Sequence, residues 1–396
     1  MPLLPQRHPT GDLHFPDFPL WQGVAEKPGH AIALPFRLGI DGWGFIRQTT
    51  DREVRRRITE AYGDPNYRFI TPPPGRTGWG TQLGEGKLRQ LLEHVPDLGG
   101  RSILEIGAGS SHIARRILAD HGAARYVIVD PALEGEDVGR DPRLVCLPGF
   151  FPETGGEAGS FDLVVAFSCL EHVDDPVAFL SAIRMTLKPQ DGRCFLVFPD
   201  IARAFREGDV TALQHEHMLY LDRPGTEALF AAAGLEILRL TSWQDGFSCL
   251  AAACPSPVLD RPPDLGAARQ LLGQLAESYA THFAVTVKSV SERLGAGKRI
   301  ACVGATNGLS QLLHLGGIGA APNLAIFDGD PAKEGCFLAI SPHPIRHTPH
   351  IAGVPFDHVY ITAGTFHGEI KAQLLRFGIP ADRIEAPFGS ASAGPS

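Results

Sequence analysis

The chain has 396 residues, of which 43% are apolar and 20% are charged, and its net charge is −8. A chain of this length holds two or three domains and buries a large core, so its composition excludes a disordered protein. The negative charge argues against a protein that binds nucleic acid, because that affinity depends on clustered Lys and Arg.

The seven cysteines lie mostly in apolar stretches and form no CxxC pair. This pattern predicts free thiols in a reducing cytoplasm, and neither a disulfide framework nor a zinc site. The N-terminal residues lack a secretion-signal pattern, and no apolar run approaches the ~18 residues of a membrane span. We therefore expect a cytoplasmic chain that binds neither membrane nor nucleic acid.

Residues 1–85 are rich in Pro, Gly and aromatic residues and predict a small N-terminal domain. The segment 33–48 is typical of a β-hairpin with its turn at residues 41–42. Asp51 is expected to cap a helix over 51–62. The segment 66–79 has the composition of a loop, which would either cover a neighbouring cleft as a lid or simply pack there.

Residues 101–130 carry the pattern around which the chain is organised: an apolar strand, a small-residue turn, an amphipathic helix and a second strand. Glu105 lies near the end of the first strand, Gly107 and Gly109 form the turn, and Asp130 ends the second strand. This is the layout of the nucleotide-binding half of a doubly wound sheet. The glycines let the backbone approach a ligand, and the terminal acid can accept hydrogen bonds from both ribose hydroxyls. The third glycine of the dinucleotide fingerprint is missing, so an ordinary βα turn is the alternative.

A third strand is expected at 144–147, followed by Phe150, and a fourth at 161–166, followed by Ser168 and His172. The pattern then continues through a helix to residue 187, a helix over 223–233 and strands at 194–198, 235–240 and 250–253.

In this order, residues 88–253 resemble a class I S-adenosylmethionine-dependent methyltransferase. The resemblance implies S-adenosylmethionine as the cofactor, with its methionine part over the glycine turn and its adenosine beside the second and third strands. The cofactor-binding residues that it implies are Glu105, Gly107, Gly109, Asp130, Phe150 and Ser168.

After a Pro-rich linker, the segment 265–294 has the pattern of one long helix, and the strand–turn–helix–strand–acid order then returns over 298–328. Gly304 and Asp328 take the places of the turn glycine and the terminal acid. A further strand at 357–363 and a helix at 368–377 complete a second, smaller α/β domain. Its glycine turn and Asp328 suggest that this domain holds the nucleotide part of a substrate.

The densest polar cluster is Gln214-His215-Glu216-His217. We favour acid–base chemistry there, because imidazole has a pKa near ~6.5. A metal site is a weaker alternative, because the spacing is not HExxH and no third ligand is indicated. A solvated loop is the other alternative.

The HEH block with its following Tyr220, the Gly234-Leu235-Glu236 turn and the C-terminal Lys333-Glu334-Gly335 resemble the nucleotide-sugar C-methyltransferases. That resemblance implies a keto-sugar enolate that attacks the methyl group of the cofactor. It implies His217 as the base, with His215 as the second choice, Glu216 as the orienting acid, and His172 beside the keto oxygen.

Two features depart from that family. Its N-terminal domain usually binds zinc through CxxC pairs, but this chain has no cysteine before Cys146, so we expect no metal. The residue before the HEH block is typically Tyr and is Gln214 here.

The expected architecture is a Rossmann-like class I methyltransferase core with a small N-terminal domain and a smaller C-terminal α/β domain. Its expected parts are 1–85, 86–254, a linker and long helix over 255–297, and 298–396. The expected partner is a small-molecule substrate, a nucleotide sugar. The alternatives are O-methylation of a sugar or another hydroxylated metabolite, and a scaffold that binds cofactor without turnover. An NAD-dependent oxidoreductase is disfavoured, because neither glycine turn is GxGxxG.

Overall fold

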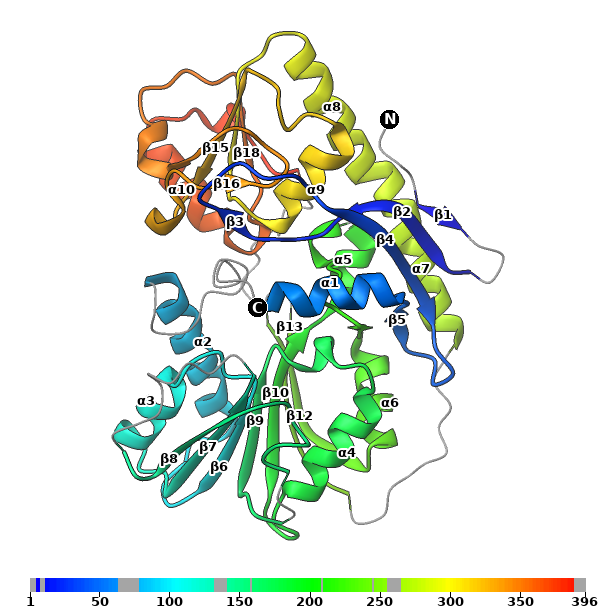
Figure 1. The fold of residues 1–396 in the computed structure, drawn as a ribbon, viewed down its shortest axis with the longest axis vertical. Coiled ribbons are helices and arrows are strands. Elements are labelled where there is room, and N and C mark those ends of the chain that lie inside the picture. The colour runs from blue at the N-terminus through cyan, green and yellow to red at the C-terminus, as the bar shows by residue number, and fades with distance from the viewer. Residues whose placement is uncertain are drawn as a thin grey trace.

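The computed structural model describes residues 5–7, 11–62, 78–131, 141–156, 159–207, 209–243, 246–254 and 265–387. Figure 1 shows the central sheet in the lower half of the molecule and the C-terminal sheet in the upper half, with N-terminal strands beside both. Most of the loop expected at 66–79 falls outside the described residues. None of the helices in the described ranges has the length and hydropathy that a membrane crossing requires.

The central sheet has the order β12-β13-β10-β9-β6-β7-β8, in which β13 alone is antiparallel to its neighbours. The strand order reverses between β6 and β9, and ligands of such sheets bind where that reversal meets the carboxyl ends of the strands. The strands are β6 (Ser102–Ile106), β7 (Arg125–Asp130), β8 (Leu144–Pro148), β9 (Leu163–Phe167), β10 (Arg193–Pro199), β12 (Leu235–Trp243) and β13 (Gly246–Ala253).

Helices cover both faces of this sheet because successive strand residues point to opposite sides. Ile103 and Tyr126 pack with α2 and α3, whereas their neighbours Leu104 and Val127 pack with α4 and α6. The doubly wound core expected from the sequence is thereby confirmed. The helices are α2 (Gly78–His94), α3 (His112–Asp120), α4 (Pro176–Thr186) and α6 (Arg223–Ala232).

The expected N-terminal hairpin is confirmed, and it belongs to a five-stranded sheet of order β1-β2-β4-β5-β11. Asp51 accepts a hydrogen bond from the Val54 amide at 2.9 Å and caps α1 (Arg52–Tyr62), as expected. The last strand of this sheet comes from directly after the HEH block, which the sequence had assigned to the core. The strands are β1 (Gln6–Arg7), β2 (Leu13–Pro19), β4 (Ala33–Ile40), β5 (Ile46–Gln48) and β11 (Leu219–Tyr220).

The C-terminal sheet is parallel throughout and has the order β17-β15-β14-β18-β19. The long helix expected at 265–294 contains a π-helical turn at Tyr279–Phe283, whose two terminal rings are buried. The elements are α7 (Leu265–Ser278), α8 (Ala284–Gly295), β14 (Ile300–Val303), α9 (Asn307–Gly316), β15 (Leu324–Asp328), β17 (Ile345–His347), β18 (His358–Ile361), α10 (His367–Arg376) and β19 (Ile384–Glu385).

The N-terminal strands share one hydrophobic core with the C-terminal part of the chain and with α5 (Ile201–Glu207). Phe15 of β2 packs against Tyr279 with ring centroids 5.3 Å apart. In addition, β3 (Val24–Ala25) pairs with β16 (Phe337–Leu338). The four-part division of the chain stays a prediction, and these contacts show that its first and last parts are packed together.

Candidate active site

Glu105 lies at the carboxyl end of β6 and is 1% exposed. Its Oε2 accepts a hydrogen bond from the Tyr126 hydroxyl at 2.9 Å. Burial raises the pKa of Glu105 to about 7, against the opposing effects of Tyr126 and of the positive charge of Lys87. A cationic group beside this carboxylate would favour its charged form.

The two glycines of the turn both have left-handed backbone angles, φ +71° at Gly107 and +66° at Gly109. A Cβ on Gly107 would lie 2.4 Å from the Cys169 sulfur, so the close approach of the loop after β9 requires glycine. Asp130 accepts a hydrogen bond from the Gly109 amide at 2.8 Å. The terminal acid of β7 therefore lies against the glycine turn, as the cofactor assignment needs.

Phe150 and Ser168 flank this edge of the sheet from the loops after β8 and β9. Phe150 is 68% exposed and follows Gly149, whose amide donates to the Asp130 carbonyl. Ser168 is exposed and is the only residue other than glycine in the described part of the chain with a positive φ, +57°. Such backbone strain gathers at functional sites.

Lys87 also lies at this edge of the central sheet, and it was not identified from the sequence as a candidate site residue. It projects from α2, its Nζ lies 5.6 Å from the centre of the Phe167 ring, and its charge acts on Glu105 and Glu171. Burial lowers the pKa of Lys87, although both carboxyl groups oppose that change. A single Lys on an amphipathic helix carries no sequence signal, because only the fold places it against strand ends.

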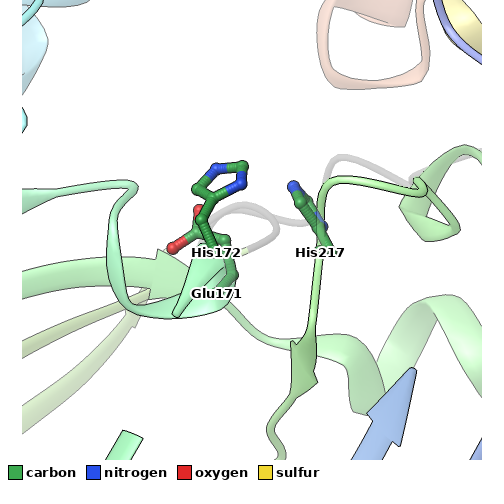
Figure 2. A group of neighbouring side chains, drawn as sticks. All are labelled: Glu171, His172 and His217. Carbon is green, nitrogen blue, oxygen red and sulfur yellow. The ribbon is translucent and has the colours of Figure 1, made fainter. Parts of the chain in front are cut away.

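His172 and His217 form a pair of facing imidazoles (Figure 2), which are arranged edge to face with ring centroids 5.0 Å apart. His172 ends a short 3₁₀ helix, Leu170–His172, directly after β9. Its Nδ1–H donates to the Glu216 carbonyl at 3.0 Å, so the neutral ring carries its lone pair on Nε2. The Met218 amide donates to the Glu171 carbonyl at 2.7 Å, which holds the two histidine segments together.

Both imidazoles have a pKa below the value of ~6.5 on which the expectation of acid–base chemistry rests, so both are neutral near pH 7 and are weaker bases than a free imidazole. Burial lowers the pKa of His172 to about 4, although its hydrogen bond to the Glu216 carbonyl raises it in part. Burial lowers the pKa of His217 well below its usual range, and the neighbouring His172 lowers it further. Each ring therefore offers a lone pair to a ligand or a proton.

Glu171 lies below the two rings in Figure 2 and is 4% exposed. Its Oε2 is fully buried and has no hydrogen-bond partner among the described residues. Burial raises the pKa of Glu171 to about 7. One ligand atom from each of Glu171, His172 and His217 lies within 4.8 Å of the other two.

The structure does not bring His215 to this pair. Its ring packs against Phe18 and Phe36 of the N-terminal sheet, with centroids 5.8 and 5.2 Å away. The HEH block is not extended, because the His217 amide donates to the Gln214 carbonyl at 3.0 Å and closes a turn at residues 215–216. This turn directs the two imidazoles to different neighbours, and only His217 lies against His172. Glu216 orients His172 through its backbone carbonyl and not through its carboxylate.

The N-terminal sheet holds the HEH block in place. Gln48 at the end of β5 donates from its side chain to the His215 carbonyl at 2.8 Å, and its amide donates to the Met218 carbonyl at 3.1 Å. Tyr220 donates its hydroxyl to the Gln214 carbonyl at 3.2 Å and so closes the block on itself. The position of His217 thus depends on Gln48, which lies far earlier in the chain, in the N-terminal sheet.

The glycine turn of the C-terminal domain, at Gly304, differs from that of the core because its acid, Asp328, is bonded to the protein itself. Asp328 accepts hydrogen bonds from the Ala305 amide at 2.8 Å and from the Asp330 amide at 2.9 Å, and it pairs with the Lys333 Nζ at 3.0 Å. Both of its oxygens are therefore used by the protein itself. This arrangement weakens the expectation that Asp328 binds the nucleotide part of a substrate.

Comparison with known proteins agrees with this geometry. A methyltransferase domain family matches residues 81–240. A protein of Mycolicibacterium smegmatis, named as a probable S-adenosylmethionine-dependent methyltransferase, is 30% identical over 201 residues, which are 47% of this chain and 75% of that protein. A ubiquinone biosynthesis O-methyltransferase of Histophilus somni is 26% identical over 185 residues, 44% of this chain and 72% of that protein.

The chain belongs to the S-adenosylmethionine-dependent methyltransferases. It is an enzyme whose cofactor is S-adenosylmethionine, and its fold is the Rossmann-like fold of class I. The solved structures that it resembles include a 1,6-didemethyltoxoflavin-N1-methyltransferase of Burkholderia thailandensis, which is 15% identical with a TM-score of 0.41 and is covered over 96% of its length, against 55% of this chain. A likeness that distant adds nothing to the assignment.

Proposed function

We propose that this methyltransferase transfers the methyl group to a carbon of a nucleotide-linked or related keto-sugar, through an enolate. The observation that carries this proposal is the pair of facing, neutral imidazoles at the reversal point of the sheet. Carbon becomes a nucleophile only after a proton next to a carbonyl group is removed, and that step needs an unprotonated base within hydrogen-bond reach.

Each residue has a separate role in this mechanism. His217 takes the proton next to the ketone, and the resulting enolate carbon attacks the methyl carbon of the sulfonium. The bond between sulfur and methyl breaks, and S-adenosylhomocysteine leaves with the electron pair on sulfur. In this proposal His172, on the loop that also contacts Gly107, lies beside the keto oxygen. Because Glu216 uses its Nδ1–H, its Nε2 would have to take up a proton before it could donate to the developing oxyanion.

The residues at the carboxyl ends of β6, β7, β8 and β9 are the proposed contacts of the cofactor. We propose that Glu105 faces the methionine amino group of the cofactor, that Gly107 and Gly109 lie under it, and that Asp130 binds the ribose. The exposed Phe150 ring would then lie along the adenine. Ser168, strained and exposed next to Gly107, would complete the cofactor side.

O-Methylation of a small hydroxylated metabolite is the second candidate. The relatives named as ubiquinone biosynthesis O-methyltransferases favour it, because they are 25–27% identical to this chain over 122–185 residues. In that reaction His217 removes a proton from a hydroxyl group and not from carbon. The two reactions differ in whether a carbon-bound proton ever exchanges with solvent.

A proton-exchange experiment tests the proposal. In heavy water with S-adenosylhomocysteine and a keto-sugar nucleotide, the enzyme should exchange the proton next to the ketone without methylation. The His217→Asn variant should lose this exchange and about a hundredfold or more in methylation rate, the usual size of a general-base contribution. Its affinity for S-adenosylmethionine should change little.

The matched control is His350→Asn, which removes an exposed histidine of the C-terminal domain. It should keep both exchange and turnover. Exchange that persists undiminished in His217→Asn, or a product methylated on oxygen, would refute the enolate mechanism.

A further inference from the structure

The group of Glu171, His172 and His217 has the composition of a transition-metal site. Two imidazoles and one carboxylate are the protein ligands of several three-ligand zinc sites, which leave a fourth position open. The three ligand atoms here lie within 4.8 Å of one another (Figure 2). They come from two chain segments that are held together by a backbone hydrogen bond, from the Met218 amide to the Glu171 carbonyl, and by the bond from the His172 side chain to the Glu216 carbonyl.

The orientation of His172 is that of a metal ligand. A histidine that binds a metal usually donates its other ring N–H to a carbonyl or a carboxylate, which fixes the ring and the tautomer. Here Nδ1–H donates to the Glu216 carbonyl at 3.0 Å and leaves Nε2 as the ligand atom.

Glu171 supplies a second, independent indication. Its side chain is buried almost completely, and its Oε2 has no hydrogen-bond partner in the described part of the chain. A buried carboxylate oxygen without a partner is costly, and a bound cation is one of the groups that satisfies such an oxygen. The backbone carbonyl of Glu171 is bonded to the Met218 amide, which fixes the segment. The residue's own amide and the charge of Lys87 also act on its carboxyl group, and Oε2 is the oxygen that is left for a ligand.

We propose that Glu171, His172 and His217 bind one divalent transition-metal ion of the Zn²⁺ type, and that the bound ion inhibits methyl transfer. Imidazole and carboxylate together suit Zn²⁺, Co²⁺ and Ni²⁺ better than Mg²⁺ or Ca²⁺, which prefer oxygen ligands. The inhibition rests on the proposed function, because the ion takes the lone pair with which His217 removes the proton. Binding itself is measured without any acceptor.

The first test measures binding to metal-stripped enzyme. Calorimetry with Zn²⁺ and visible absorption with Co²⁺ should show one strong site in the unaltered chain. Loss of an outer partner of a metal site costs about 10–100-fold in affinity, so loss of a ligand should cost more than about 100-fold. We expect this loss in each of Glu171→Gln, His172→Asn and His217→Asn.

His350→Asn is the matched control for binding. His350 lies 3.0 Å from the Glu334 carboxylate in an exposed ion pair, so it tests whether any surface His–Glu pair accounts for the signal. The strong site should persist in this variant. Thermal unfolding and S-adenosylmethionine binding show whether each variant is folded, and a folded Glu171→Gln that keeps full Zn²⁺ affinity would overturn the proposal.

The second test measures the effect on turnover. Methylation by the metal-stripped enzyme should fall in proportion to Zn²⁺ occupancy and return on addition of a chelator. Turnover that is unchanged or increased at full occupancy would overturn the inhibitory role. Failure of the proposed function looks different, because the metal-stripped enzyme would then show neither proton exchange nor methylation while Zn²⁺ still bound.

Discussion

The two glycine turns of this chain share a sequence pattern but differ in what lies against them. In the core, the turn after β6 lies against Cys169, which directly follows the strained Ser168 in the loop after β9. In the C-terminal domain, the turn after β14 is closed by the protein: Thr362 donates to the Gly304 carbonyl at 2.6 Å.

The helices that follow the turns differ in the same way. Asn307 and Gln311 of α9 donate to the Leu213 carbonyl at 3.2 and 2.9 Å, so the chain's own segment covers that helix. Two positions before the turn glycine, the core has Glu105 and the C-terminal domain has the buried thiol of Cys302, whose pKa burial raises to about 12. The strand–turn–helix–strand–acid pattern thus predicts the local fold correctly in both domains. It indicates a ligand site only in the core, where the turn is not covered by the protein's own segments within the described ranges.

The two turns should differ most in the effect of removing the acid that ends the second strand, which is Asp130 in the core and Asp328 in the C-terminal domain. Asp328→Ala should lower the free energy of unfolding by about 3 kcal/mol, because it removes the carboxylate partner of the mostly buried Lys333, which retains its hydrogen bond to the Ala305 carbonyl. It should leave S-adenosylmethionine affinity unchanged. Asp130→Ala should instead weaken S-adenosylmethionine by roughly ten- to a hundredfold, the worth of a hydrogen bond to a charged group. Calorimetry and chemical denaturation of both variants measure these effects, and an unchanged affinity in folded Asp130→Ala would remove that residue from the site.

Substitution of the turn glycines should have a smaller effect on stability, and its effect on cofactor binding should differ between the two turns. Alanine at a left-handed position costs about 1–2 kcal/mol, so Gly107→Ala and Gly304→Ala should both destabilise the fold by at least that amount. Their Cβ atoms would also lie 2.4 Å from the Cys169 sulfur and 2.8 Å from the Ala363 Cβ, respectively. Only Gly107→Ala should weaken cofactor binding. Equal cofactor affinity in the two folded variants would contradict the assignment of the first turn.

The smallest effect is a pH dependence that only the core turn should show. Because the pKa of Glu105 is raised to about 7, the carboxyl group is mostly protonated below that pH and must lose its proton to pair with the cofactor's ammonium group. S-Adenosylmethionine affinity should therefore rise from pH 5.5 to 7, by at most about tenfold per unit. Tyr126, Lys87 and Asp130 also act on this carboxyl.

Glu105→Gln is the control for this pH dependence. It should flatten the profile, while Glu171→Gln, which alters another carboxyl group of raised pKa, should keep it. A slope that survives in Glu105→Gln would place the titrating group elsewhere.

The sequence predicted the central sheet well, because its strands are apolar runs whose partners follow at regular intervals along the chain. It predicted only the hairpin of the N-terminal sheet and the three inner strands of the C-terminal sheet. It could not choose between His215 and His217, since that choice depends on the turn over residues 214–217, which directs the His215 ring to the N-terminal sheet and the His217 ring to His172. It also missed Lys87, which only the docking of α2 brings to Glu105. Lys333 lies five positions after Asp328, yet only the fold shows that its side chain turns back onto that acid.

The joint core of the N- and C-terminal parts has a consequence for biosynthesis. Phe15 and Phe36 are translated early, but Tyr279 and the strand β16, which cover and pair with the N-terminal segment, are translated more than 240 residues later. Domains generally fold as units during synthesis, starting from the N-terminus. The methyltransferase core can therefore form on the ribosome while the strands that position His217 still expose their apolar faces. Such exposed edges are aggregation-prone, so the nascent chain should depend on chaperones until its last hundred residues emerge.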